Sequence, residues 1–207
     1  MARRVIVLGA PYSGADQVTE IIHRLGVNMR KDLELSELRK LHGGLWQDKD
    51  FVDRNDTMLR AAYGYWHLPP SKEAIEKLPE QHAAELLTYK GNDAGSWGWY
   101  DPRTMLTLPK WLPHIEDKGP KLVLVTRNIH QNQADLFTNH YELLSRHDCM
   151  DLIREYNTRA FDVVTSRGLP YIHIQVEALG LHAEIQVQKI ADFIGVAYKE
   201  AALEAFD

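Results

Sequence analysis

The first residues with a recognisable chemical pattern form a turn bounded by glycines, residues 9–14 (GAPYSG). The two glycines have the spacing of the phosphate-binding loop G-x-x-x-x-G-K-[ST]. Such a turn, placed before a helix, presents backbone N–H groups that can bind an anion. Ala15 and Asp16 replace the lysine and the hydroxyl of that motif, which argues against a magnesium-dependent nucleotide hydrolase. The turn predicts an anion site, and a plain tight turn between strand and helix is the alternative.

Two arginines follow other apolar runs and could neutralise an anion at the same place. Arg103 comes shortly after the run 97–100, and Arg127 directly follows the run 121–126. The carboxyl ends of parallel strands meet at one edge of a sheet, where α/β proteins bind their ligands. We therefore expect both guanidinium groups to lie near the turn and to face an anionic ligand.

The elements that position these residues alternate between strand and helix patterns. This alternation predicts a mostly parallel sheet covered by helices on both faces, an α/β three-layer sandwich like that of the P-loop nucleoside triphosphate hydrolases. The predicted strands cover residues 5–8, 97–100, 121–126 and 171–176, and the predicted helices cover a segment ending at Gly26 and residues 104–115, 130–144, 148–165 and 183–194.

Residues 29–90, between the first strand–helix unit and the second strand, are polar and irregular. We interpret them as a helical insertion within one domain spanning residues 1–207. The insertion could form a wall of the ligand site or a plain helical cover. Its predicted helical segments are 32–41, 55–62, a helix that Ser71 caps and that runs toward Leu78, and 80–89.

The composition restricts the classes of partner and compartment. A formal net charge of −5 argues against broad nucleic-acid binding, although a local basic pocket is compatible with it. The single cysteine, Cys149, excludes an internal disulfide and fits a reducing compartment. No apolar run approaches a membrane span, and Pro11 interrupts the first run too early for a signal peptide. We expect a cytoplasmic protein, and its oligomeric state stays open.

One group of possible metal ligands lies on a predicted helix. His130, Asp135 and His140 are spaced five residues apart. Ligands on one helix face are spaced three or four residues apart, so these three side chains point in different directions. We predict no metal site.

Several segments together resemble the PAPS-dependent sulfotransferases, especially the compact bacterial members. The most specific segment is 97–104 (WGWYDPRT), whereas the glycine turn alone would be a weak signal. The similarity extends over almost the whole chain, through residues 9–16, 46–66, 123–136 (VLVTRNIHQNQADL) and 174–195.

The resemblance implies a site for 3′-phosphoadenosine 5′-phosphosulfate (PAPS) or its product PAP, and sulfuryl transfer to a hydroxyl or amine of a small acceptor. The first loop would hold the 5′-phosphosulfate, and Arg127 would hold the 3′-phosphate. Such transfer needs an in-line acceptor, a base and positive charge on the departing oxygens. The implied cofactor positions are Gly9, Tyr12, Ser13, Gly14, Ala15, Asp16, Arg127 and Asp135, and those facing substrate or anion are Gln47, Tyr100 and Arg103.

The chain departs from the family pattern at these same positions. Each lost cation removes a charge-assisted hydrogen bond of roughly 1.5–3 kcal/mol. Asp16 is worse than a neutral change, because a carboxylate at a helix N-terminus repels an incoming phosphate. The family usually has arginine or lysine at Tyr12, threonine or serine at Ala15 and Asp16, lysine at Tyr100, glutamate at Gln47 and serine at Asp135.

The change at Gln47 removes the residue that resembles the base for the acceptor proton. A carboxamide cannot take a proton at neutral pH. The candidate substitutes within the insertion are His42, Asp48, Asp50 and His67, each of which could equally be a solvated loop residue. An inactive relative that keeps the fold as a binding or interaction module is therefore the alternative to an active sulfotransferase.

Overall fold

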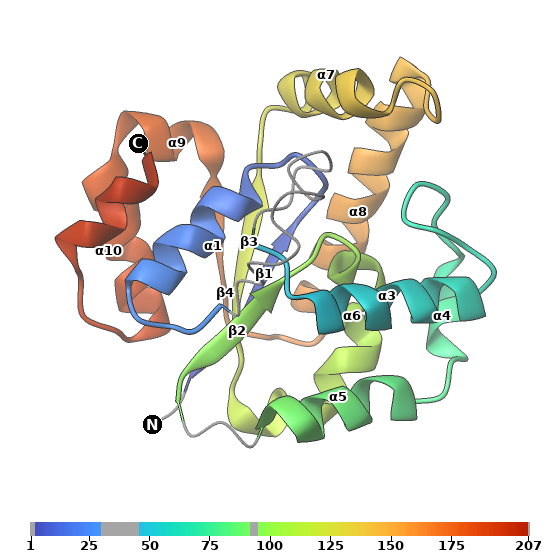
Figure 1. Ribbon diagram of the computed structural model, residues 1–207, viewed down its shortest axis with the longest axis horizontal. Coiled ribbons are helices and arrows are strands. Elements are labelled where there is room, and N and C mark those ends of the chain that lie inside the picture. The colour runs from blue at the N-terminus through green and yellow to red at the C-terminus, as the bar shows by residue number, and fades with distance from the viewer. Residues whose placement is uncertain (1–2, 30–45, 92–94, 207) are drawn as a thin grey trace.

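A parallel four-stranded sheet forms the centre of the protein in the computed structural model, which describes residues 3–29, 46–91 and 95–206 (Figure 1). The strand order is β2-β1-β3-β4, so the first strand lies inside the sheet. Every pairing is parallel, as expected where helices connect successive strands. The strands are β1 (Arg4–Gly9), β2 (Trp97–Tyr100), β3 (Lys121–Thr126) and β4 (Tyr171–Gln175).

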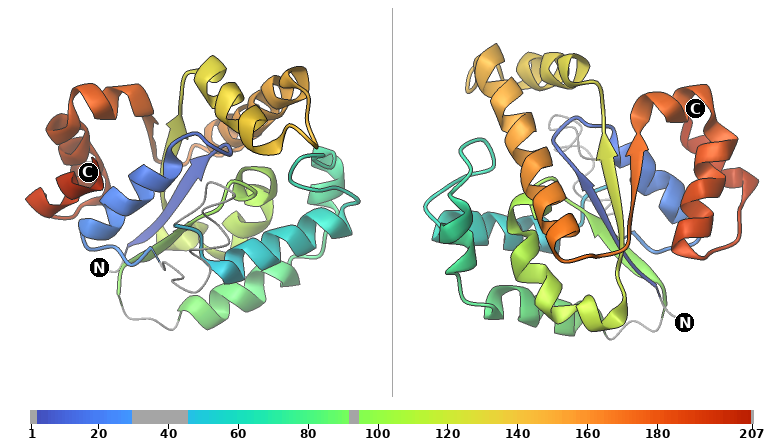
Figure 2. Two further views of the ribbon diagram at one scale, coloured as in Figure 1. Left: turned by 45° about the horizontal axis from the view of Figure 1, so that its top comes forward. Right: turned by 180° about the vertical axis from the view of Figure 1, so that it is seen from behind.

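Helices cover both faces of this sheet (Figure 2). The α-helices are α1 (Ala15–Arg24), α3 (Lys49–Ala61), α4 (Lys72–Glu76), α5 (Gln81–Gly91), α6 (Thr104–Trp111), α7 (Ile129–His140), α8 (Arg146–Ser166), α9 (Val176–Leu181) and α10 (Ala183–Ile194), and short 3₁₀ helices span Leu112–His114, Glu116–Lys118 and Glu200–Phe206.

Alternate side chains of β1 build two separate cores. Val5 and Val7 pack with apolar residues of α1 and α10, whereas Ile6 and Leu8 pack with those of α3, α6 and α8. All four side chains are fully buried. A strand buried on both faces reads as a continuous apolar run, which is why the sequence indicates it so clearly. The predicted α/β sandwich with a parallel sheet is confirmed.

Several element boundaries differ from the predictions because local hydrogen bonds fix them. The helix predicted at 55–62 begins at Lys49, where the Asp48 side chain caps it. The helix predicted at 148–165 begins at Arg146, after a capping box formed by Ser145 and Asp148. The helix predicted at 104–115 tolerates Pro109 but changes to 3₁₀ geometry after Trp111.

The end of the chain adds two elements that the sequence did not predict. Val176 begins helix α9 instead of ending the fourth strand, and residues 200–206 form a 3₁₀ helix against α1.

Ser71 caps α4 as predicted, accepting a hydrogen bond from Ala74 N at 3.1 Å. The segment predicted to be helical at 32–41 lies outside the described residues. None of the described helices has the length and apolar character to cross a membrane.

Helix α3 ends in a Schellman motif with an unusual residue at its left-handed position. Gly64 N donates to Leu59 O at 2.9 Å, and Tyr63 N donates to Arg60 O at 3.0 Å. Tyr63 has φ 61°, a conformation that glycine adopts without steric cost. Its side chain is 97% exposed, so little packing offsets the backbone strain.

We therefore expect Tyr63→Gly to raise the free energy of unfolding by about 0.5–1 kcal/mol, because relief of strain exceeds the added entropy of the unfolded chain. Urea denaturation of both proteins measures the difference. Tyr141→Gly is the matched control, since Tyr141 is also exposed but has ordinary right-handed geometry. A loss of stability in Tyr63→Gly would contradict the strain argument.

Candidate functional site

The turn after β1 places the N-terminus of the first helix at the carboxyl edge of the sheet. Ser13 N donates to Ala10 O at 3.0 Å, which closes the turn. Tyr12 and Gly14 both have positive φ, 62° and 79°. Gly14 is required both for this positive φ and because an added Cβ would lie 2.8 Å from Val176 Cγ2. Gly14, the residue before α1, has no side chain that could cap the helix, and the positive end of a helix dipole favours an anion.

Arg127 lies beside this turn but is already engaged. Its Nη1 donates to the Tyr12 carbonyl oxygen at 3.3 Å, so the end of β3 and the turn meet as the strand topology predicts. The same Nη1 forms an ion pair with Asp135 Oδ2 at 2.5 Å. Asp135, at the position where the resemblance implies a serine, therefore pairs with the guanidinium that was expected to hold the 3′-phosphate.

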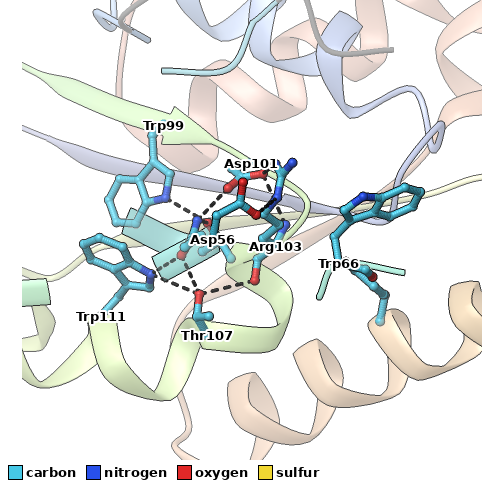
Figure 3. A network of polar contacts seen from close by, with 10 residues as sticks. Asp56, Trp66, Trp99, Asp101, Arg103, Thr107 and Trp111 are labelled. Carbon is cyan, nitrogen blue, oxygen red and sulfur yellow. Dashed lines mark hydrogen bonds and ion pairs between the residues drawn. The ribbon is translucent and has the colours of Figure 1, made fainter. Parts of the chain in front are cut away.

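Arg103 is held between two carboxylates (Figure 3). Its Nη1 lies 2.8 Å from Asp101 Oδ1, and its Nε lies 2.7 Å from Asp56 Oδ1. Burial alone would lower the pKa of Arg103, but Asp101 and Asp56 outweigh it and raise the pKa above its usual value. Burial raises the pKa of Asp56, and Arg103 opposes only part of that rise. This group of three carries a net charge of −1 when both carboxylates are ionised.

Asn55 joins this ion pair to the core beneath it. The Asn55 side chain is fully buried, and its Nδ2 donates to Asp101 Oδ2 at 2.7 Å. Its Oδ1 accepts hydrogen bonds from Thr107 and from the Trp111 indole, at 2.6 and 2.9 Å. Helix α3 is thereby tied to β2 and α6, with Asp101 at the junction (Figure 3).

A cleft at the sheet edge adjoins the turn and Arg103, and we call it the sheet-edge cleft. Its cavity is about 150 Å³ in volume, and its walls are largely aromatic and apolar. The Tyr12 hydroxyl lies 3.1 Å from His140 Nε2, and the Tyr156 hydroxyl donates to Trp66 O at 2.8 Å. Burial, then Asp135 and Asp16, raise the pKa of Tyr12 to about 12. The lining residues are Pro11, Tyr12, Gln47, Trp66, Pro102, Arg103, His140, Leu143 and Tyr156.

The predicted cofactor positions in and after the turn are buried, sterically required or hydrogen-bonded to other parts of the chain. Ser13 is buried, and its Oγ has no hydrogen-bond partner among the described residues. Gly9 is needed because a Cβ there would lie 2.5 Å from Ser13 Oγ and from the fully buried Ala15. Asp16 Oδ1 accepts a hydrogen bond from Trp46 N at 3.3 Å, which ties α1 to the chain before α3.

Tyr100 does not face the sheet-edge cleft. Its side chain is fully buried in the core that β1 shares with α1, and burial raises its pKa well above the usual range. The lysine implied by the resemblance at this position is therefore replaced by a core residue. Gln47, by contrast, lines the cleft together with Arg103.

The predicted substitute bases that the structure describes, Asp48, Asp50 and His67, do not line this cleft. Asp48 and Asp50 both pair with the buried Lys90, at 2.9 and 2.6 Å. His67 stacks on Tyr65 and lines an adjoining pocket. His42 lies outside the described residues. No group of histidine, cysteine or acidic residues in the described segments has the geometry of a metal site.

Sequence reasoning missed two residues of the cleft. The sequence pattern indicated His140 only as one of three possible metal ligands that point in different directions, and it did not single out Tyr156. Both come from helices of the second half of the chain, α7 and α8, that reach the cleft through tertiary packing. Tyrosine and histidine side chains on helices are too common for the sequence to single these two out.

Comparison with known proteins supports the fold. The sequence matches no protein-family model, and no curated protein matches it. Solved structures match over nearly the whole chain, at low identity. The sulfotransferase domain of the curacin biosynthetic pathway has a TM-score of 0.62 at 15% identity, covering 100% of this chain and 78% of that domain.

Two further structures give the same result. Sulfotransferase STF9 of Mycobacterium avium has a TM-score of 0.64 at 14% identity, covering 99% of this chain and 66% of that protein. Mouse sulfotransferase SULT7A1, solved with PAP, has a TM-score of 0.56 at 10% identity, covering 99% of this chain and 65% of that protein. The chain thus has the sulfotransferase fold and spans about two thirds of the length of these two proteins.

The position of Asn55 predicts its energetic role. Asn55→Ala removes the partner of four buried polar groups, so we expect the free energy of unfolding to fall by about 2–4 kcal/mol. Chemical denaturation measures the change. Asn139→Ala is the control, because Asn139 is exposed on α7. If Asn55→Ala lowers the free energy of unfolding no more than the control does, the hydrogen bonds of Asn55 do not hold α3 to β2.

Proposed function

We propose that this chain is a sulfotransferase-fold binding protein that does not transfer a sulfuryl group from PAPS. One observation carries the proposal: both arginines expected to face the anionic cofactor are paired with the chain's own carboxylates. Asp135 neutralises Arg127, and Asp101 with Asp56 more than neutralises Arg103. A bisphosphate nucleotide would enter an edge where the carboxylates paired with these two arginines already outnumber them.

The cost of binding PAP follows from these pairs. The Asp135 carboxylate lies 2.5 Å from Arg127 Nη1. A 3′-phosphate dianion that binds Arg127 would have to displace this carboxylate and would still lie close to its negative charge. Like charges at such separations repel strongly, and Asp16 adds a further carboxylate in the first turn of α1. The backbone N–H groups of α1 are the remaining attraction that the turn offers.

The chemistry of transfer is also poorly supported. The carboxamide of Gln47 cannot accept the proton of an acceptor hydroxyl or amine. Tyr100, in place of a lysine, is buried in the core and supplies no positive charge to departing oxygens. The sheet-edge cleft suits an uncharged small molecule with a planar group, because Tyr12, Trp66 and Tyr156 line it and its arginine is neutralised.

Sulfuryl transfer from PAPS to a small hydroxyl or amine acceptor is the second candidate. The observation that favours it is the N-terminus of α1, whose positive dipole end follows the turn that Arg127 contacts at Tyr12 O. Ser13 and Gly14 would then hold the phosphosulfate, with PAPS supplying the activated sulfuryl group. His140 lines the same cavity as Gln47 and would take the acceptor proton.

Calorimetric titration with PAP separates the two candidates. We expect no saturable binding to the natural chain at micromolar PAP. Asp135→Ser should raise the affinity for PAP tenfold or more, because it removes a repelling carboxylate and frees a charged hydrogen-bond donor of roughly 1.5–3 kcal/mol.

Asp53→Ser is the matched control, since it removes an exposed carboxylate that pairs with Lys49 on α3. It should leave PAP binding as in the natural chain. Micromolar binding of PAP to the natural chain that is lost in Arg127→Ala would refute the binding-protein proposal and support the enzyme.

A further inference from the structure

A second pocket adjoins the sheet-edge cleft at the C-terminal end of α3, and we call it the α3 pocket. It has a volume of about 310 Å³, which is large enough for a small molecule. Trp66 and Arg103 line both the pocket and the cleft, so the two sites share a boundary. The residues that line the α3 pocket are Asp56, Leu59, Arg60, Gly64, Tyr65, Trp66, His67 and Arg103.

Two opposite charges line this pocket from one face of α3. Asp56 and Arg60 are four residues apart on the helix, and the Cβ atoms of such residues lie about 5–6 Å apart. The Asp56 side chain is 33% exposed and Arg60 is exposed, so a molecule in the pocket can reach both. A ligand that carries an ammonium group and a carboxylate on one carbon atom would match this spacing.

The Asp56 carboxylate is only partly compensated by the positive charges around it. Its Oδ1 lies 2.7 Å from Arg103 Nε, but Arg103 also pairs with Asp101. Burial, the largest cause, raises the pKa of Asp56, and Asp101 adds to the rise. Arg103 and Arg60 offset only part of it. An ammonium group placed beside Asp56 would therefore stabilise its ionised form.

Arg60 provides the positive charge for the other end of such a ligand. It lies in the last turn of α3, where it could form an ion pair with Asp56. In the structure Asp56 pairs with Arg103 instead. The Arg60 guanidinium therefore lies at an exposed edge of the pocket, where its planar set of donors suits a carboxylate.

An aromatic hairpin forms a further wall of the α3 pocket. Tyr65 N donates to Leu68 O at 2.9 Å and Leu68 N donates to Tyr65 O at 3.2 Å, so Trp66 and His67 form a two-residue turn. The His67 ring stacks on the Tyr65 ring, with centroids 5.8 Å apart. The Tyr156 hydroxyl donates to Trp66 O at 2.8 Å and ties the hairpin to α8. The hairpin thus presents fixed aromatic rings to a planar ligand group.

We propose that the α3 pocket binds a free aromatic α-amino acid as its zwitterion. The ammonium group donates to Asp56, and the carboxylate accepts from Arg60. The aromatic ring packs against Tyr65 and Trp66. A ligand with a single charge would leave either Asp56 or Arg60 without its counterpart. No part of this site requires PAP, so the proposal does not depend on the proposed function.

Titration with L-phenylalanine, followed through ¹³C-labelled leucine methyl groups, tests the proposal. Leu59 lines the α3 pocket and Leu143 lines the sheet-edge cleft, so each reports on one site. Phenethylamine lacks the carboxylate, and 3-phenylpropanoate lacks the ammonium group. We expect L-phenylalanine to shift the Leu59 resonance saturably and to bind at least tenfold more tightly than either comparison molecule. Equal binding of all three, a shift confined to Leu143, or no saturable shift would overturn the proposal.

Arg60→Met removes the assigned partner of the carboxylate. We expect it to weaken L-phenylalanine binding at least tenfold and to leave phenethylamine binding no weaker, because phenethylamine has no carboxylate. Arg54→Met is the matched control, since Arg54 lies on the same helix and pairs with Glu85 outside the pocket.

Unchanged binding of L-phenylalanine to a folded Arg60→Met variant, or equal weakening of both molecules, would contradict the role assigned to Arg60. The comparison of the three molecules on the natural chain decides the proposal even if this variant fails to fold.

Discussion

The structure depends on one buried charge pairing, that of Asp101 with Arg103 directly after β2. Asp101 is fully buried, so its carboxylate must be neutralised and hydrogen-bonded to be tolerated there. Arg103 and Asn55 do both, and Asn55 in turn binds the hydroxyl of Thr107 and the Trp111 indole. Breaking the pair would leave a charge exposed to the core, and α3 would lose its attachment to the sheet.

This pairing changes what the sulfotransferase-like segment 97–104 says about function. The Trp99 indole donates to Thr104 Oγ1 at 3.1 Å, and Trp97 and Trp99 pack near Phe51 of α3. Those residues are therefore explained by the fold they build. Because packing alone accounts for these residues, the segment that resembles the family most carries little information about activity.

The sequence predicted the layers well and the site only in part, for a physical reason. Strands buried on both faces are continuous apolar runs, and the parallel order then places Arg127 beside the turn without any side-chain detail. Tyr100 lies opposite Val7 in the sheet register and packs in the same core. The sequence did not reveal this, because aromatic residues occupy both faces of the strand 97–100. The ion pairs of Arg103 and the approach of His140 depend on how α3 and α7 pack, and no local pattern encodes that.

The substitutions at the sheet edge are consistent with one another. Without a bound phosphate, an arginine at the position of Arg127 would stand uncompensated next to the positive end of α1. Asp135 supplies the missing negative charge from within the chain, and Asp16 does the same for the helix terminus. Each carboxylate stabilises the positive charge beside it and would oppose a phosphate placed at this edge. Stability without cofactor and affinity for it are therefore opposed at this edge, and the residues present favour stability.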